Sequence, residues 1–185
     1  MHKDIKEILI SKIQINKRVQ ELGKLISLNY QQKDLILVGL LSGCNPFIGD
    51  LIKCIDLDFE IHYMKVSSYV DTKSSGHVAI LLDILRNIEN KDILIIEDII
   101  DTGHTLNKVV SLLKARNPKS IKIMTLLDKR EGRIVSINVD YVGFVVKNVF
   151  VVGYGLDYNE KYRNLPYIGI LKESVYAKEK VNDNK

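Results

Sequence analysis

Two continuous apolar runs constrain the fold of this chain more than any other feature. Leu35–Leu41 reads LILVGLL, and residues 93–96 read ILII. Runs of this length without polar alternation are typical of strands that are covered on both faces, as in a parallel sheet. Helical patterns separate the strand-like segments of the chain, which indicates right-handed β-α connections. The sequence therefore predicts an α/β fold with a mainly parallel sheet.

Patterns along the rest of the chain predict the helices and the remaining strands. Residues 11–30 begin with the capping-box spacing of Ser11 and Gln14 and continue with apolar residues at steps of three and four, as in a helix. Pro46 suits the first turn of a second helix, and the apolar face beginning at Leu106 predicts a third. Further strands are expected at residues 59–66, 78–82, 121–127, 141–144 and 149–152.

Composition limits the class of protein. The chain has 185 residues, 46% of them apolar, which is enough for one substantial core. The formal net charge of +4 is spread along the chain, and the late charged run, residues 172–185, is typical of a solvated tail. We therefore expect a single domain over residues 1–185, with 172–185 as a mobile C-terminal tail.

The cysteines and the lengths of the apolar runs indicate the cellular compartment in which to expect this protein. Cys44 and Cys54 belong to no disulfide framework and to no zinc-like spacing. The N-terminus has no signal-peptide block, and no apolar stretch reaches the roughly 18 residues of a membrane span. We expect a cytoplasmic protein with no membrane partner.

The segment at residues 93–105, ILIIEDIIDTGHT, carries the strongest functional signal. Ligands of open α/β sheets bind beyond the carboxyl ends of the strands. Gly103 allows a tight turn there, and Thr102 and Thr105 place hydroxyls beside the free N–H groups of a helix start. The segment is therefore predicted to hold a phosphate group.

Two neighbouring carboxylates, Glu97 and Asp98, stand at the predicted end of the preceding strand. They would repel each other and a bare phosphate unless hydroxyl donors or a divalent cation were present. A sugar diol and Mg²⁺ would meet that need. Simple solvation is the alternative for such an acidic pair, but the D-T-G-x-T pattern of residues 101–105 favours a ligand site.

The segment ILIIEDIIDTGHT resembles the phosphoribosyl pyrophosphate motif of type I phosphoribosyltransferases. The LDKR of residues 127–130, together with residues 141–171, narrows the resemblance to hypoxanthine-guanine phosphoribosyltransferases. The resemblance covers residues 8–171. It implies the type I fold, in which helices flank a mainly parallel central sheet and terminal segments form a small hood beside a mobile lid loop.

The resemblance implies that the loop after the acidic pair holds the 5′-phosphate, while the pair faces the ribose hydroxyls. The phosphate-binding residues would be Asp101, Thr102, Gly103, His104 and Thr105. His104 stands at a variable place of the motif, so we expect contact through its backbone. Asp101 is the expected catalytic residue, either as general base for the purine N7 proton or as an anion that stabilises the developing positive charge.

The resemblance implies a purine site in the second half of the chain. Lys129 matches a lysine that donates to the 6-oxo group, which selects hypoxanthine or guanine over adenine. Phe150 matches the aromatic residue that stacks on the base, and Val151 would supply backbone groups for the base edge. Without the resemblance, an aromatic residue in a strand is more often part of the core.

On the pyrophosphate side, Asp157 matches a carboxylate near the purine that ligates Mg²⁺, and Arg163 matches an arginine that contacts pyrophosphate. The acidic pair supplies the other expected metal ligands. Gly43 lies in the pyrophosphate loop, whose first peptide bond can be cis, and Ser42 replaces the basic residue of many relatives. We therefore expect backbone N–H groups, Mg²⁺ and Arg163 to contribute more of the pyrophosphate binding. A turn or cap is the alternative role of Asp157.

Ser68 and Tyr69 lie in the polar stretch 67–77 and match the Ser-Tyr of the lid. A closed lid would exclude water from a transition state with oxocarbenium character. A loop without a role is the alternative.

The resemblance implies a purine-salvage transferase. It would move the 5-phosphoribosyl group from phosphoribosyl pyrophosphate to N9 of hypoxanthine or guanine, giving IMP or GMP and pyrophosphate. Mg²⁺ is the expected cofactor and a homodimer or homotetramer the expected assembly. Two alternatives stay open: a xanthine-preferring transferase, and a phosphoribosyltransferase-like regulator that binds nucleotide and RNA. A regulator needs a clustered basic surface, and none is evident before residue 172, so no nucleic-acid partner is expected.

Overall fold

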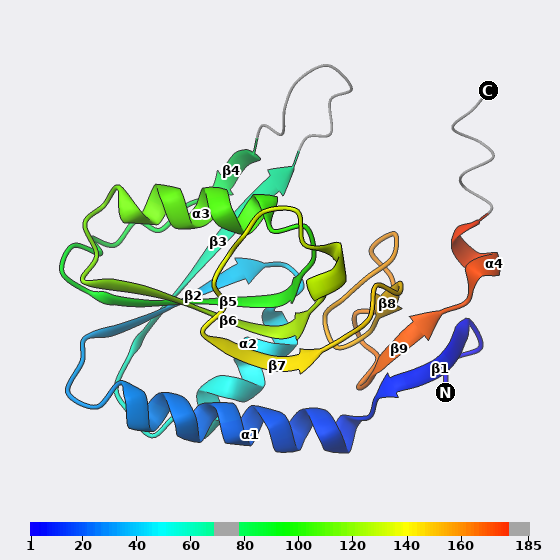
Figure 1. Ribbon diagram of the computed structural model, residues 1–185. Helices are drawn as coiled ribbons and strands as arrows, with labels where there is room; N and C mark the ends of the chain where they lie inside the picture. The colour runs from blue at the N-terminus through cyan, green and yellow to red at the C-terminus, as the bar shows by residue number, and fades with distance from the viewer. Residues whose placement is uncertain (69–77, 178–185) are drawn as a thin grey trace.

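The computed structural model describes residues 1–68 and 78–177. A six-stranded sheet forms its centre, in the order β4-β3-β2-β5-β6-β7 (Figure 1). All neighbouring strands are parallel except β3 and β4. This confirms the predicted α/β fold. The strands are β2 Leu35–Leu41, β3 Glu60–Ser68, β4 Val78–Leu82, β5 Asp92–Ile100, β6 Ser120–Asp128 and β7 Tyr141–Val145.

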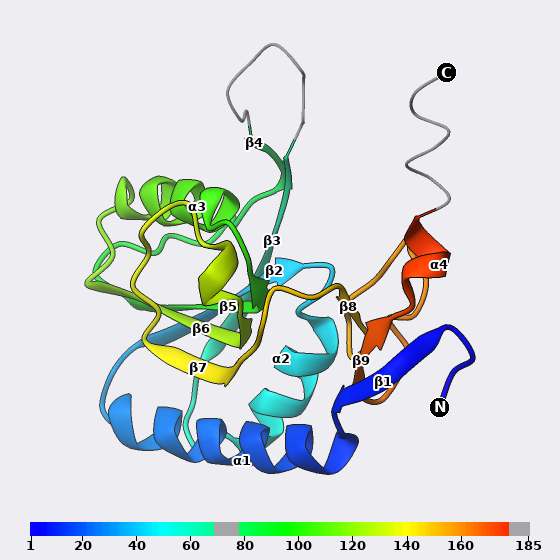
Figure 2. The same ribbon diagram turned by 45° about the vertical axis from the view of Figure 1, so that its right-hand side comes forward.

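Helices cover both faces of this sheet, as the apolar runs indicated. Helices α1 (Lys12–Asn29) and α2 (Asn45–Leu51) lie on one face, and α3 (His104–Lys114) lies on the other (Figures 1 and 2). Leu35 and Leu37 of β2 pack in the core with α1 and α2, whereas Ile36 and Val38 pack in the core with α3. Alternate side chains of one strand are thus buried in opposite layers.

The start of α1 follows directly from the sequence. The Ser11 side chain accepts a hydrogen bond from the Gln14 backbone N–H, and the Gln14 side chain accepts one from the Ser11 N–H. This reciprocal capping satisfies two N–H groups that the first helical turn leaves free. Short 3-10 turns, η1 at Ile52–Cys54 and η2 at Arg130–Gly132, follow α2 and β6.

Both ends of the chain build a second, three-stranded sheet beside the first. Its order is β1-β9-β8, from β1 (Ile5–Ile10), β9 (Ile168–Leu171) and β8 (Val151–Val152), and its pairs are antiparallel. This confirms the hood of terminal segments. Helix α4 (Glu173–Tyr176) follows β9, so part of the expected tail is helical, and only residues 178–185 of it lie outside the described residues.

Two strands differ from the sequence predictions in ways that affect the site. Strand β5 does not end before Glu97, because β6 continues to pair with it after its last pair with β2, Gly39 with Ile96, and aligns Glu97 with Thr125 and Ile99 with Leu127. The acidic pair therefore lies inside a strand rather than after it. The strand expected at residues 149–152 is limited to β8.

The lid prediction falls at the boundary of the described residues. Ser68 is the last residue of β3, and Tyr69 lies outside the described residues. Within the described ranges, no helix combines the length and apolarity that crossing a bilayer requires.

Candidate active site

The predicted phosphate loop forms the passage from β5 to α3. Gly103 takes a left-handed backbone conformation with φ of 85°, and a Cβ there would lie 3.1 Å from the Val135 carbonyl oxygen. Glycine therefore suits both the conformation and the close approach. His104 is the first residue of α3. A hollow of about 160 Å³ lies over the loop, lined by Glu97, Ile99, Ile100, Asp101, Thr102, Gly103, Thr105 and Leu106.

The acidic pair stands in an environment that disfavours two negative charges. Burial raises the pKa of Glu97 well above its ordinary value, and the neighbouring Asp98 carboxylate adds to the rise. Burial raises the pKa of Asp98 to about 6, although the Ile99 N–H and Arg163 oppose that rise. Burial and the neighbouring charge therefore both act against a full negative charge on each carboxylate.

The predicted pyrophosphate loop contacts the acidic pair directly. A Cβ at Gly43 would lie 1.6 Å from Asp98 Oδ2, so only glycine allows this approach without displacing the carboxylate. The peptide bond between Leu41 and Ser42 is cis. Gly155 packs against the same loop, because its own Cβ would lie 2.0 Å from the Gly43 carbonyl oxygen. Strand β5 and two loops, all distant in sequence, meet here.

Asp157 and Arg163 lie on the loop that contains Gly155. Arg163 Nη1 is 2.9 Å from Asp157 Oδ1 and donates to the Gly155 carbonyl oxygen at 2.8 Å. Asp157 Oδ2 also accepts a hydrogen bond from the Glu160 backbone N–H. These contacts hold one carboxylate and one guanidinium beside Asp98, whose pKa both of them influence.

Lys129 and Asp101 bring the phosphate loop and the predicted purine site together. Lys129 Nζ donates to Asp101 Oδ2 at 3.3 Å. The Lys129 side chain is 10% exposed, whereas that of Asp101 is 46% exposed. The Lys129 backbone N–H also donates to the Ile100 carbonyl oxygen at 3.0 Å. A buried cation thus stands beside an accessible carboxylate.

A family model of the phosphoribosyl transferase domain matches residues 5–159. The chain belongs to the phosphoribosyltransferase family. It is similar to the hypoxanthine-guanine phosphoribosyltransferase of Bacillus subtilis, with 54% identity over 177 residues, covering 95% of this chain and 98% of the relative.

Two further relatives extend this comparison. A crystal structure of a hypoxanthine phosphoribosyltransferase from Staphylococcus aureus superposes with a TM-score of 0.92 at 49% identity, covering 95% of this chain and 96% of that one. The bifunctional protein TilS/HprT of Listeria innocua is 53% identical over 178 residues. That match covers 96% of this chain but spans only 28% of the length of the Listeria protein.

Arg133 is a residue of this phosphoribosyltransferase that sequence reasoning missed. Its Nε donates to the Asp101 carbonyl oxygen at 3.1 Å, and its Nη2 pairs with the Asp128 carboxylate. The N–H groups of Ile134 and Val135 both donate to the Thr102 carbonyl oxygen at 3.0 Å. The segment after η2 therefore holds the phosphate loop from outside. In the sequence, a cluster of basic residues at 129, 130 and 133 is the feature that could have indicated a role for Arg133.

Phe150 is not a core residue, because it is 38% exposed, so the alternative considered for it is wrong. The segment before it contacts the loop after Lys129, since the Asn148 N–H donates to the Glu131 carboxylate at 3.4 Å. Val151 pairs with Ile170 in the hood. Phe150 therefore stands where the hood joins the central sheet.

The acidic side chains can be compared with what a Mg²⁺ ion requires. Within the described residues, no group of three or more His, Cys, Asp or Glu side chains is placed to hold a metal ion. Protein-bound Mg²⁺ usually keeps several waters and takes one or two carboxylates together with substrate phosphates. Asp98 and Asp157, which influence each other electrostatically, fit this partial set. The residues therefore suit a Mg²⁺ ion that arrives with a phosphorylated substrate.

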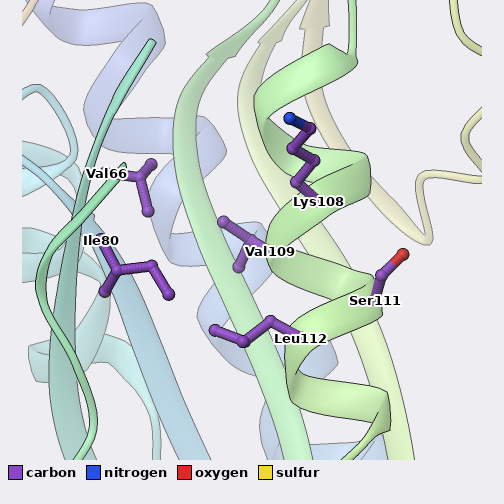
Figure 3. A pocket seen from close by; sticks show the side chains of 6 residues that line it. All are labelled: Val66, Ile80, Lys108, Val109, Ser111 and Leu112. Atoms are coloured by element: carbon purple, nitrogen blue, oxygen red, sulfur yellow. The ribbon is translucent and has the colours of Figure 1, made fainter. Parts of the chain in front are cut away.

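A separate apolar hollow of about 300 Å³ lies between α3 and the β3–β4 edge of the sheet. Val109 and Leu112 point from α3 toward Val66 and Ile80 (Figure 3). Such a lining offers few polar groups for a phosphate or a purine edge. It is therefore a poor candidate for the site of phosphoribosyl transfer.

Proposed function

We propose that this phosphoribosyltransferase moves the 5-phosphoribosyl group from phosphoribosyl pyrophosphate to N9 of hypoxanthine and guanine. The products are IMP or GMP and pyrophosphate. The observation that carries the proposal is the 3.3 Å contact between Lys129 Nζ and Asp101 Oδ2. The relative from Bacillus subtilis, matched over 98% of its length, carries the name of this activity.

The Lys129–Asp101 pair suits the edge of a 6-oxopurine. O6 and N7 are neighbours on that edge, so a cation and a carboxylate side by side can bind an oxygen acceptor and an N7 proton together. Adenine presents an amino group instead of O6 and would meet the lysine with a second donor. The pair therefore favours hypoxanthine and guanine over adenine.

Asp101 acts on the proton of the base in this proposal. As N9 attacks the anomeric carbon and the bond to pyrophosphate breaks, Asp101 takes or shares the N7 proton. Its carboxylate also faces the positive charge that develops on the ribose. The 46% exposure of its side chain leaves it accessible to both groups.

The phosphate loop would hold the 5′-phosphate. Thr102 and Thr105 line the hollow there, and the start of α3 presents free backbone N–H groups. Glu97 and Asp98 would bind the ribose hydroxyls, because a carboxylate oxygen accepts a hydrogen bond from a hydroxyl group. His104 would contribute its backbone rather than its ring.

Arg163, Asp157 and the backbone of Gly43 would bind the pyrophosphate side. When bound, Mg²⁺ supplies charge neutralisation to the phosphate oxygens. Asp157, Glu97 and Asp98 would hold that ion from the protein side, and Arg163 would bind the leaving oxygens. Because Ser42 carries no charge, Arg163 carries a larger share of that binding than it would beside a basic loop residue.

Phe150 would stack on the base, Val151 would bind its edge through the backbone, and Ser68 and Tyr69 would close over the site. We further propose one domain over residues 1–185, a homodimeric or homotetrameric assembly, and a cytoplasmic location. The two free cysteines support a reducing compartment.

The test is a panel of four bases, each with phosphoribosyl pyrophosphate and Mg²⁺, and product measured by chromatography. The proposal expects efficient conversion of hypoxanthine and guanine, weak conversion of xanthine and none of adenine. A preference for xanthine would favour the second transferase alternative. Absence of any transfer, together with nucleotide binding, would favour the regulator.

A further inference from the structure

The Phe150 ring has a partner that the proposed mechanism does not use. Tyr176 of α4 stacks on it, with ring centroids 5.1 Å apart and planes inclined by 22°. Tyr158 meets Phe150 at 5.5 Å with an interplanar angle of 88°. Stacked and edge-to-face rings at these separations attract each other. Phe150 is therefore held by two aromatic neighbours although it is partly exposed.

One face of the Phe150 ring is left uncovered by these neighbours. The two tyrosines are 6.5 Å apart, so the directions from Phe150 to them make an acute angle, and neither lies over the face opposite Tyr176. In both views, β8 lies between α4 and the β5–β6 part of the central sheet (Figures 1 and 2). Tyr176 belongs to α4, whereas Asp101 and Lys129 follow β5 and β6, so the helix that carries Tyr176 and these two residues lie on opposite sides of β8.

The segment that carries Tyr176 also holds the backbone of Phe150. The Leu171 N–H, at the end of β9, donates to the Phe150 carbonyl oxygen at 3.0 Å. The Lys172 N–H donates to the Asp4 carbonyl oxygen at 3.0 Å, which ties the start of α4 to the N-terminal segment. Backbone and ring of Phe150 are thus positioned by one continuous stretch of chain.

We propose that Tyr176 is a positioning residue for the purine: its ring backs Phe150 and presents the opposite face of Phe150 to the base. The inference rests on the proposed function, in which Phe150 stacks on the base. Without Tyr176, the Phe150 ring would keep only its edge-to-face contact with Tyr158 and would be less ordered until a purine binds. Immobilising one such side chain on binding weakens affinity by about threefold to tenfold.

The direction of the change in the KM for the base distinguishes a positioning role of Tyr176 from two other roles. If Tyr176 instead occupied the place of the purine, its removal would open the site and lower the KM for the base. If it only stabilised the hood, its removal would change thermal stability and leave the KM for the base at the wild-type value.

The experiment compares Tyr176→Ala, Tyr176→Leu and Tyr176→Phe with wild type. We expect Tyr176→Ala to raise the KM for hypoxanthine by about threefold to tenfold, with the KM for phosphoribosyl pyrophosphate unchanged. Tyr176→Phe restores the wild-type KM because it keeps the ring. Tyr176→Leu keeps apolar bulk, so that the protein stays folded, yet raises the KM. Ser174→Ala, an exposed position on the same helix, is the matched control.

A Phe150→Leu variant distinguishes failure of the inference from failure of the proposed function. If Phe150→Leu raises the KM for hypoxanthine and Tyr176→Ala does not, Phe150 stacks on the base without needing Tyr176, and the inference is overturned alone. If neither variant changes this KM, the assignment of Phe150 is wrong as well. A lowered KM in Tyr176→Ala also overturns the inference. The expected result is that Tyr176→Ala adds nothing to the effect of Phe150→Leu in the double variant.

Discussion

The two halves of the candidate site are built in different ways. The phosphate half comes from one continuous segment, residues 97–105, which passes from β5 into α3. The proposed purine half combines Lys129, which follows β6, with Phe150, Val151 and Asp157, which come about twenty residues later around β8. The first half is therefore visible as a motif, whereas the second depends on contacts that no local pattern contains. The halves join where Lys129 contacts Asp101.

This comparison predicts that substitutions in each half will affect different substrates. Variants of the phosphate half should change turnover or the KM for phosphoribosyl pyrophosphate. Variants of the purine half should change the KM for the base or the choice among bases.

Removal of divalent metal should abolish transfer. In the described residues, no group of three or more His, Cys, Asp or Glu side chains is placed to hold a metal ion, so Mg²⁺ would need ligands from the substrate phosphates as well as one or two carboxylates. The measurement is product formation after dialysis against chelator, with Mg²⁺ added back as the control. Undiminished turnover in chelator would contradict the role assigned to Asp98 and Asp157.

Asp101→Asn should lower kcat by about 10²-fold to 10⁴-fold, because a positioned general base contributes about that much. The KM for phosphoribosyl pyrophosphate should stay near wild type, since the amide keeps the shape of the loop. Steady-state kinetics measure both quantities, and Asp58→Asn, an exposed carboxylate elsewhere, is the control. Wild-type turnover would remove Asp101 from the chemistry.

Gly43→Ala should lower kcat/KM for phosphoribosyl pyrophosphate by about tenfold to a hundredfold, the range expected when a crowded contact must shift. A Cβ there would lie 1.6 Å from Asp98 Oδ2 and would displace the carboxylate. The KM for hypoxanthine should change less. Gly49→Ala, where a Cβ meets nothing within 4 Å, is the matched control. An effect on the base alone would contradict the placement of Gly43.

Stability should depend on pH through the acidic pair. Because burial raises the pKa of Asp98 to about 6 from 3.8, the folded state keeps a proton that the unfolded state releases between these values. The contribution of Asp98 to the free energy of unfolding therefore falls as pH rises from about 4 to 6. Asp98→Asn should be more stable than wild type by about 1 to 2 kcal/mol at pH 8, and by less at pH 5. Urea denaturation of both proteins at the two pH values measures this, and equal differences would contradict it.

The comparison also explains which parts of the fold could be predicted from the sequence. The run LILVGLL and the capping residues Ser11 and Gln14 act locally, so the buried strand and the start of α1 follow from them. The end of β5 could not be placed in the same way. Its last residues pair with β6 on one side only, and that neighbour is more than twenty residues away in sequence.

The same distinction applies to the site. Gly103 could be assigned because its left-handed conformation is a local requirement of the loop. The roles of Arg133 and Tyr176 arise from contacts across 32 and 26 positions, with Asp101 and Phe150. The strand β1 was missed for a related reason, since its partner β9 lies at the other end of the chain. Resemblance to a family supplied the purine residues that physical patterns alone left ambiguous.

The most direct test of whether the phosphate half and the purine half form one site is the base specificity of the Lys129→Gln variant. The ratio of kcat/KM for hypoxanthine to that for adenine should fall by about tenfold, because the variant loses a charged donor to O6. Turnover at saturating hypoxanthine should fall less. An unaltered ratio would show that Lys129 does not contact the base, and it would contradict a single site in which Lys129 and Asp101 act together.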